Sequence, residues 1–307
     1  MKKITNPISR CFIRISGLIC LIAAMIFTVV PEKISAAEKT GYVYTIINNQ
    51  ATITGFEGEP TYIEIPETIE GCRVVELRDN AFYECSSLKH IVLPDTLEKI
   101  GHHTFYGCSS LESIVIPDSV TEIGMGSFCG CQSLTSAILP ENLPRLPESC
   151  FRSCTSLKSI TIPRNTAEIG DFCFSGCTSL SAVSLGDSTK IIGDCAFYMC
   201  SSMKGLYIPD SVQLMGLCSV GYVPTNDGAQ TLEGFTILGE KKSAAQEYAA
   251  ENKLSFESAS DSVHAFAIQR ITGQRIGIPT IYLVGGAVFI LTSAFLLSRR
   301  KISGRKK

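Results

Sequence analysis

Cysteine is the residue type in this chain with the most chemistry available to it. The 307 residues include 14 cysteines, and the spacings of Cys129-Gly130-Cys131 and of Cys150 and Cys154 resemble those of metal ligands. Structural zinc sites use two such pairs, but here each pair contains a cysteine from an evenly repeated series that we expect in the core. We therefore expect no metal site and no cofactor.

Histidine offers little for catalysis. His102 and His103 follow Gly101 at an expected corner of the chain, where side chains are solvated, and His90 lies in an expected strand. A cysteine nucleophile paired with histidine needs a cleft, and the sequence has no serine nucleophile elbow, phosphate-binding glycine loop or His-Glu-x-x-His motif. We expect a protein that is not an enzyme and has no small-molecule substrate.

Many of the cysteines belong to a repeat that recurs at every 23rd position and stays in phase for six copies. The three clearest columns are Phe82, Phe105, Phe128, Phe151, Phe174 and Phe197; Cys85, Cys108, Cys131, Cys154, Cys177 and Cys200; and Leu88, Leu111, Leu134, Leu157, Leu180 and Met203. A fixed period in this range predicts a solenoid of stacked coils, because a single coil cannot bury its apolar face alone.

Each copy predicts the same short elements. Residues 111–116 end in an alternation typical of a strand, and Pro117 ends that strand because proline cannot donate to a ladder. Residues 120–123 predict a second short extended piece, and Gly107 allows a tight bend on the remaining side. Equivalent strands stacked in register give parallel ladders with rungs about 4.8 Å apart.

The in-phase cysteines are expected to be buried and reduced, in particular Cys108, Cys131, Cys154 and Cys177. Equivalent side chains on successive rungs have Cβ atoms about 4.8 Å apart, whereas a disulfide needs about 3.8 Å and converging directions. The state of the other cysteines stays open, because an even number of cysteines in an exported chain also suits disulfides.

The ends of a solenoid expose apolar rungs and need caps. Residues 42–54, with a turn at Asn48-Asn49, predict a β-hairpin cap at the N-terminal end. A strand at 232–238 and a helix that begins at Ser243 predict a strand-helix cap at the C-terminal end.

Both ends of the chain carry features directed to a membrane. Residues 1–37 have a basic start, an apolar stretch and a small-residue cleavage site, which predicts a signal peptide, with an uncleaved anchor as the alternative. Residues 278–298 carry no charge and are long enough to span a bilayer, and the basic residues 299–307 follow them. We expect a transmembrane helix with a cytoplasmic tail and extracellular repeats, with a buried core helix as the alternative.

The expected order of parts follows from these signals. It is a signal peptide at 1–37, an N-terminal cap and lead-in at 38–76, repeats at 77–228, a C-terminal cap at 229–257, a stalk at 258–277, a transmembrane helix at 278–298 and a tail at 299–307. The net charge is −2 overall, +4 in 1–37 and +6 in the tail, which leaves −12 for the middle. That sign argues against nucleic acid as a partner.

The repeat pattern Ile-Gly-x-x-x-Phe-x-Gly-Cys-x-x-Leu-x-x-Ile-x-Ile-Pro resembles the BspA-type leucine-rich repeat of bacterial and some protist surface proteins. The resemblance covers about residues 42–257 and is carried by six in-phase copies. It implies a mainly β, right-handed leucine-rich-repeat coil with stacked parallel strands. It also implies a secreted or surface-attached binding protein, often an adhesin, without catalytic residues.

The C-terminal end also resembles a Gram-positive cell-wall sorting signal. Thr272-Gly273 lies where the cleaved pair would be, but Gln269-Arg270 stands where Leu-Pro is required. This departure favours a retained membrane helix over wall attachment.

The outward side of the expected strands is the candidate binding surface. Alternation places one column of side chains outward on successive rungs, and it is apolar for three rungs. The candidate residues are His90, Val92, Val115, Ile138, Thr161 and Tyr207. Solenoids bind partners through such extended faces, and aromatic residues are enriched at interface hot spots. The alternative is that valine, isoleucine and threonine simply suit strands.

Together these features predict a non-enzymatic, surface-anchored protein that binds a protein ligand, including adhesion to host or neighbouring cells. The alternative is a structural envelope protein whose solenoids bind each other. The sequence does not identify the ligand.

Overall fold

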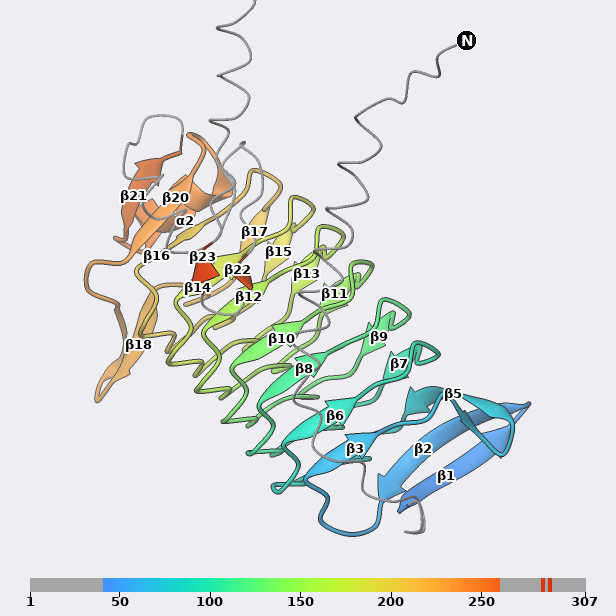
Figure 1. The fold of residues 1–307 in the computed structure, drawn as a ribbon. Coiled ribbons are helices and arrows are strands. Elements are labelled where there is room, and N and C mark those ends of the chain that lie inside the picture. The colour runs from blue at the N-terminus through green and yellow to red at the C-terminus, as the bar shows by residue number, and fades with distance from the viewer. Residues whose placement is uncertain (1–40, 260–282, 285–286, 289–307) are drawn as a thin grey trace, which may run out of the picture. The chain divides into compact units, whose positions relative to one another are not determined.

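The computed structural model describes residues 41–259, 283–284 and 287–288. The chain divides into two compact units, 1–41 and 42–307, and the described elements belong to the second. Within residues 42–259 the chain winds into successive coils that run from the hairpin β1–β2 to strand β21 (Figure 1). The signal peptide, most of the stalk and the basic tail expected from the sequence lie outside the described residues.

The coils share a main ladder of short parallel strands, one strand for each coil. The paired groups are β3–β6, β8–β10, β12–β14 and β16–β20–β21, and Figure 1 shows them as one row. Between groups the backbone continues the ladder, as where the Glu112 amide donates to the Lys89 carbonyl at 3.1 Å. The strands are β3 (Tyr62–Glu64), β6 (His90–Val92), β8 (Ser113–Val115), β10 (Ser136–Ile138), β12 (Ser159–Thr161), β14 (Ala182–Ser184), β16 (Gly205–Tyr207), β20 (Thr236–Gly239) and β21 (Ser255–Ser258).

A second ladder of parallel strands forms another side of the coils, in two sheets. The first holds β5 (Cys72–Leu77), β7 (Lys99–Ile100) and β9 (Glu122–Ile123), and the second holds β11 (Arg145–Leu146), β13 (Glu168–Ile169), β15 (Ile191–Ile192) and β17 (Leu214–Met215).

Two prolines account for the break between β9 and β11. In other coils, the residue after the second-ladder strand is a glycine, and its amide donates to the equivalent strand of the preceding coil. Gly124 donates to the Ile100 carbonyl at 2.8 Å, and Gly170 donates to the Leu146 carbonyl at 2.9 Å. The equivalent residue after β11 is Pro147, which has no N–H. Pro144, directly before β11, removes a second donor, so the ladder cannot continue here.

The third side of each coil carries the phenylalanine and cysteine columns. Coils bond directly to each other there, as from the Phe128 amide to the Cys150 carbonyl at 2.9 Å. The phenylalanine rings of successive coils stack with centroids 5.2–5.5 Å apart, and planes 1–13° from parallel, from Phe82 to Phe197. All six rings are buried, so the predicted continuous core is confirmed.

Tight bends recur on this side of every coil. Gly107, Gly130 and Gly176 have φ of 70°, 76° and 79°, as their role in a tight backbone requires. Ser153 and Met199 adopt the same left-handed conformation in their coils without being glycine, so stacking forces the bend even where the residue disfavours it.

The predicted N-terminal hairpin is present. It joins β1 (Tyr42–Ile47) and β2 (Gln50–Phe56), with Ile47 opposite Gln50. Asn48 and Asn49 have φ of 51° and 62°, as a two-residue turn of this type requires. Strand β2 pairs in parallel with β5, so the hairpin extends the second ladder. That it serves as a cap remains a prediction.

One coil lies further toward the N-terminus than the repeats expected from residue 77. Strand β3 already pairs in register with β6, and Ile63 and Ile65 are buried. Ile63 lies opposite Ile91, and the interval between them in sequence is five longer than the period. The extra residues lie around the antiparallel turn between β4 (Thr68–Ile69) and β5. Because of that insertion, this coil is out of phase with the 23-residue repeat, and the sequence pattern does not show it.

The C-terminal end contains a second insertion. Leu206 and Ile237 face each other in the ladder, but the interval between them in sequence is eight longer than the period. The antiparallel hairpin of β18 (Tyr222–Thr225) and β19 (Gly228–Thr231) lies within this segment. The boundary expected at residue 229 therefore cuts through a hairpin.

The expected strand, helix and returning strand follow the inserted hairpin. They are β20, α2 (Ala244–Glu251) and β21, which pairs in parallel with β20. The Ser243 hydroxyl accepts from the Gln246 amide at 3.4 Å and caps the helix as predicted. That this segment acts as a cap remains a prediction.

The expected transmembrane helix at 278–298 lies mostly outside the described residues. Its four described residues form two short antiparallel strands, β22 (Leu283–Val284) and β23 (Ala287–Val288), where we expected helix. Among the described residues, no helix is long and apolar enough to cross a bilayer.

We predict that Phe128→Ala destabilises the protein by about 3–5 kcal/mol, because it removes a buried ring and leaves a cavity. The loss should exceed that of Phe128→Leu, which refills part of the space. Chemical denaturation followed by circular dichroism measures both. Equal stability of Phe128→Ala and the unchanged protein would show that the ring column does not support the stack.

Candidate functional site

The outward side chains of the main ladder form the surface that we call the strand face. Every second residue of β6, β8 and β10 points outward, while Ile91 and Ile114 point inward and are buried. Val92, Val115 and Ile138 are 40%, 57% and 60% exposed. Val115 lies directly opposite Ile138 in the register, so these residues form an apolar strip across neighbouring rungs.

A column of small polar residues runs beside the apolar strip. Ser113, Ser136 and Ser159 are the first residues of their strands, and all are exposed. Small side chains leave the neighbouring aliphatic groups accessible from that side. The strip is therefore an open surface that a partner can cover, in contrast to a pocket for a small molecule.

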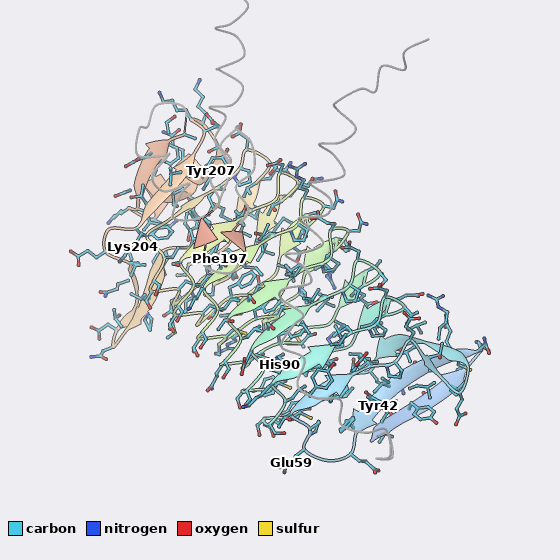
Figure 2. All side chains as sticks on the ribbon, viewed as in Figure 1. Tyr42, Glu59, His90, Phe197, Lys204 and Tyr207 are labelled. Atoms are coloured by element: carbon cyan, nitrogen blue, oxygen red, sulfur yellow. The ribbon has the colours of Figure 1, made fainter. Side chains whose placement is uncertain are left out.

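The remaining predicted site residues extend the strand face in both directions. His90 and Thr161 are exposed, on β6 and β12. Tyr207 lies on β16 in the same column but is only partly exposed. Burial raises the pKa of its phenol, and Glu240, Asp210 and Asp187 raise it further. Figure 2 shows His90 and Tyr207 towards opposite ends of the row of coils.

The structure thus brings together only part of the predicted set. The apolar strip Val92, Val115 and Ile138 is continuous, whereas the partly exposed Ser184 separates Tyr207 from Thr161 in the column. The sequence did not show that the segment around Glu240 comes close to Tyr207, because that segment belongs to the irregular C-terminal coil.

The cysteine column makes hydrogen bonds that the sequence analysis missed. Each thiol from Cys108 to Cys200 donates to the phenylalanine carbonyl of the coil before it, with Sγ–O distances of 3.1–3.3 Å. For example, Cys154 donates to Phe128 at 3.1 Å. The constant sequence interval between each cysteine and the phenylalanine of the coil before it was the available signal. Cysteine therefore serves this column both as a small apolar group and as a weak donor.

A second set of hydrogen bonds between coils was also missed by the sequence analysis. In these bonds a side chain accepts from a backbone amide of the next coil. The Asp171 carboxylate accepts from the Asp194 amide, and the Asp194 carboxylate accepts from the Leu217 amide, both at 2.7 Å. His102 occupies the equivalent place in an earlier coil, and its Nδ1 accepts from the Met125 amide at 3.0 Å. His102 therefore has a structural role here.

A hollow of about 370 Å³ lies at the break in the second ladder. Ile123 and Met125 line it on one side of the break, and Arg145, Pro147 and Glu148 line it on the other. Its ionisable groups are mostly carboxylates. No cluster of three or more histidine, cysteine or acidic side chains in the described part of the chain has the geometry to hold a metal ion.

The twelve cysteines of the described residues are all unpaired. Cys108, Cys131, Cys154 and Cys177 are buried, which confirms their predicted place in the core, and so is Cys200. Cys85, in the first copy of the series, is only partly buried, so the prediction of burial was wrong for that residue. Burial raises the pKa of the Cys108 thiol, and likewise that of Cys177, to about 12. Thiols with such pKa values are poor nucleophiles at neutral pH.

Comparison with known proteins agrees with the repeat. Residues 75–204 match the family model of the BspA type leucine rich repeat region, in six copies. A solved leucine-rich repeat protein from T. pallidum is similar at 30% identity and a TM-score of 0.55, over 59% of this chain and 86% of that one. One from Bacteroides ovatus is 24% identical with a TM-score of 0.44, over 73% and 68%. No curated protein matches the chain.

The described coils, with in-register strands on one face and a repeated apolar core, are those of a leucine-rich-repeat solenoid. The chain belongs to the BspA-type leucine-rich repeat family. Such a solenoid is consistent with a scaffold that binds proteins, and families of this kind are typically not enzymes.

We predict that iodoacetamide labels Cys108 of the folded protein very slowly at pH 8. A thiol with a pKa of about 12 is thiolate in roughly one molecule in ten thousand at that pH, and the thiolate is the reactive form. The thiolate fraction should rise about tenfold for each pH unit. Peptide mapping measures the rate, with the partly exposed Cys129 as the faster-labelling control.

In denaturant without reductant, Cys108, Cys131, Cys154 and Cys177 should all be labelled. A disulfide between any two of them would contradict the assignment of this column as buried thiols.

Proposed function

We propose that this protein is a non-enzymatic binding protein of the cell surface and that its strand face takes a protein partner. The observation that carries the proposal is the apolar strip Val92, Val115 and Ile138. These three aliphatic side chains are exposed on consecutive strands of the main ladder. Exposed aliphatic groups that line up across strands are available to be covered by a partner.

The size of the strand face suits a protein in preference to a small molecule. The strands β3, β6, β8, β10 and β12 expose both of their end residues, and at about 4.8 Å between neighbours they extend for roughly 20 Å. A face of that length suits a modest protein interface, smaller than the roughly 800 Å² on each partner of a stable complex. A small ligand would need a concave pocket, and the strip is open.

Energetics favour the apolar strip as the centre of the contact. Complete burial of a valine or isoleucine side chain contributes about 1.5–3 kcal/mol, and residues that are about half exposed contribute a part of that. Three such residues together supply part of the binding free energy, and the polar residues beside the strip must supply the rest, because association also costs translational and rotational freedom. Tyr207 supplies an aromatic group at one end of the face, beside acidic residues that suit a basic segment of a partner.

Surface attachment and adhesion are the finer part of the proposal. BspA-type proteins are often surface proteins, and a signal peptide at 1–37 with an anchor at 278–298 would place the repeats outside the cell. In that arrangement the strand face would meet host proteins or neighbouring cells.

We predict that Val115→Lys with Ile138→Lys weakens binding at least tenfold, because two charges replace the centre of the apolar strip. Binding of the full-length protein to a panel of purified extracellular proteins, and to itself, is measured by surface plasmon resonance. Ile191→Lys is the matched control, since Ile191 is an exposed aliphatic residue on the second ladder. It should leave affinity unchanged.

The stability of Ile191→Lys should change by less than about 0.5 kcal/mol, because the residue is at the surface. The double variant places two like charges opposite each other and should lose somewhat more, so circular dichroism checks that it is folded. Tyr207→Ala then tests whether the contact reaches β16. Equal affinity of the folded double variant and the unchanged protein would contradict the strand face as the site. Binding only to a second copy of this chain would indicate a self-associating envelope protein in place of an adhesin.

We predict that protease added to intact cells removes the repeats and leaves a small membrane-bound C-terminal fragment. The expected topology places residues 38–277 outside the cell and the basic tail inside. Immunoblotting with an antibody to the tail detects the fragment. Repeats that stay intact in whole cells but are cleaved in lysed cells would contradict the surface location.

A further inference from the structure

Cys195 and Cys218 occupy equivalent places in the last two regular coils. They are separated in sequence by one full period of the repeat. Both have left-handed backbones, with φ of 53° and 49°, so their side chains leave the chain in the same way. Both are partly exposed, in contrast to the cysteine column from Cys108 to Cys200, which is buried.

Backbone hydrogen bonds hold the two coils in register on either side of this pair. The Cys195 amide donates to the Leu217 carbonyl at 2.8 Å, and the Phe197 amide donates to the Ser219 carbonyl at 2.8 Å. The Leu217 amide in turn donates to the Asp194 carboxylate at 2.7 Å. The Cα atoms of Cys195 and Cys218 therefore lie about 4.8 Å apart, within the 4.4–6.8 Å range of disulfides.

The surface position separates this pair from the cysteines of the core. A core thiol such as Cys200 is fully packed and donates to the Phe174 carbonyl at 3.3 Å, so it cannot turn toward its neighbour. Bridging requires the Cβ atoms of Cys195 and Cys218 to approach by about 1 Å, from rung spacing to disulfide spacing, and the two thiols to turn toward each other. Partly exposed side chains have the freedom for that movement.

The other cysteine pairs in adjacent coils lack this freedom. Cys150 and Cys173 are also equivalent, but both are completely buried. Cys129 is partly exposed, yet Tyr106 and Arg152 occupy the equivalent places in the coils beside it. Within residues 41–259, only Cys195 and Cys218 combine equivalent positions in adjacent coils with exposure of both thiols.

We propose that Cys195 and Cys218 form a reversible disulfide in an oxidising environment, and that this bridge ties the last regular coil to the one before it. The oxidant is a low-molecular-weight disulfide such as oxidised glutathione. One protein thiolate attacks it, forms a mixed disulfide and releases one glutathione. The second protein thiolate then displaces the other glutathione. Two protein thiols and one oxidised glutathione become one protein disulfide and two reduced glutathiones, which take up the two protons.

The location gives the bridge a structural consequence. The hairpin β18–β19 interrupts the stack directly after Cys218, so the last regular coil has a less regular neighbour on that side. A crosslink there restricts fraying of the coil and stabilises it mainly by limiting the unfolded chain. The oxidised protein should therefore melt several degrees above the reduced one.

The test uses the folded full-length protein. Samples are incubated with oxidised or with reduced glutathione at alkaline pH, because burial, the Cys218 thiol and Asp194 all raise the pKa of Cys195 and exchange needs the thiolate. Free thiols are blocked with iodoacetamide, and the digest is mapped by mass spectrometry. We expect a peptide pair joined through Cys195 and Cys218 in the oxidised sample alone.

Two types of variant separate this bridge from general oxidation. Cys195→Ser and Cys218→Ser should lose the linked peptide and the rise in melting temperature, with glutathione retained on the remaining cysteine. Cys129→Ser, which changes another partly exposed cysteine, should keep both. Glutathione on each of the two cysteines of the unchanged protein without a linked peptide, or a link from either to a different cysteine, would overturn the proposal, and this result does not depend on any variant folding.

Discussion

The structure depends on a constant length of the coils, because residues one full period apart must lie next to each other with their backbones in register. Amides and carbonyls on all sides of the coil then bond to adjacent coils, as Phe128 does to Cys150 and Gly170 does to Leu146. The parallel phenylalanine rings and the thiol-to-carbonyl bonds follow from this register, because equivalent residues must lie directly above each other. A coil taken alone would leave these polar groups unpaired and its apolar side chains exposed, so its stability comes chiefly from its neighbours.

Departures from the period are placed where they do not disturb the register. Both insertions form antiparallel turns outside the ladders, one between β4 and β5 and the other as the hairpin β18–β19. The parallel pairing of the main ladder continues after each of them. The break between β9 and β11 has a different cause, since Pro144 and Pro147 keep the length of the coil but lack the N–H groups that bond to the coil before it. The hollow at this place is lined by residues from both sides of the break.

Much of the fold could be predicted from the sequence, because the period and the alternation report directly on stacking. The columns of Phe128 and Cys154, the strands ending before Pro117 and the Asn48-Asn49 turn are local signals, and the structure confirms them. The coil that contains Ile63 was missed because an insertion hid its phase. For the candidate site, the outward position of Val115 followed from alternation, whereas the partial burial of Tyr207 depends on acidic residues of an irregular coil distant in sequence. The constant sequence interval showed that each cysteine keeps a fixed relation to the phenylalanine of the coil before it, but the hydrogen bond between them depends on the three-dimensional spacing of the coils.

The most direct measurement of the register constraint compares two deletions. Removing residues 147–169 takes out one whole period, so Leu146 joins Gly170 and every later residue keeps its place in the stack. Removing residues 148–169 takes out one residue fewer, so the coil at the junction is one residue longer than the period and must either bulge or turn core side chains outward. Circular dichroism and thermal unfolding should show a folded, cooperatively melting protein for the first deletion and a clearly lower melting temperature for the second. Equal melting temperatures of the two would contradict the fixed period of the coils as the basis of this structure.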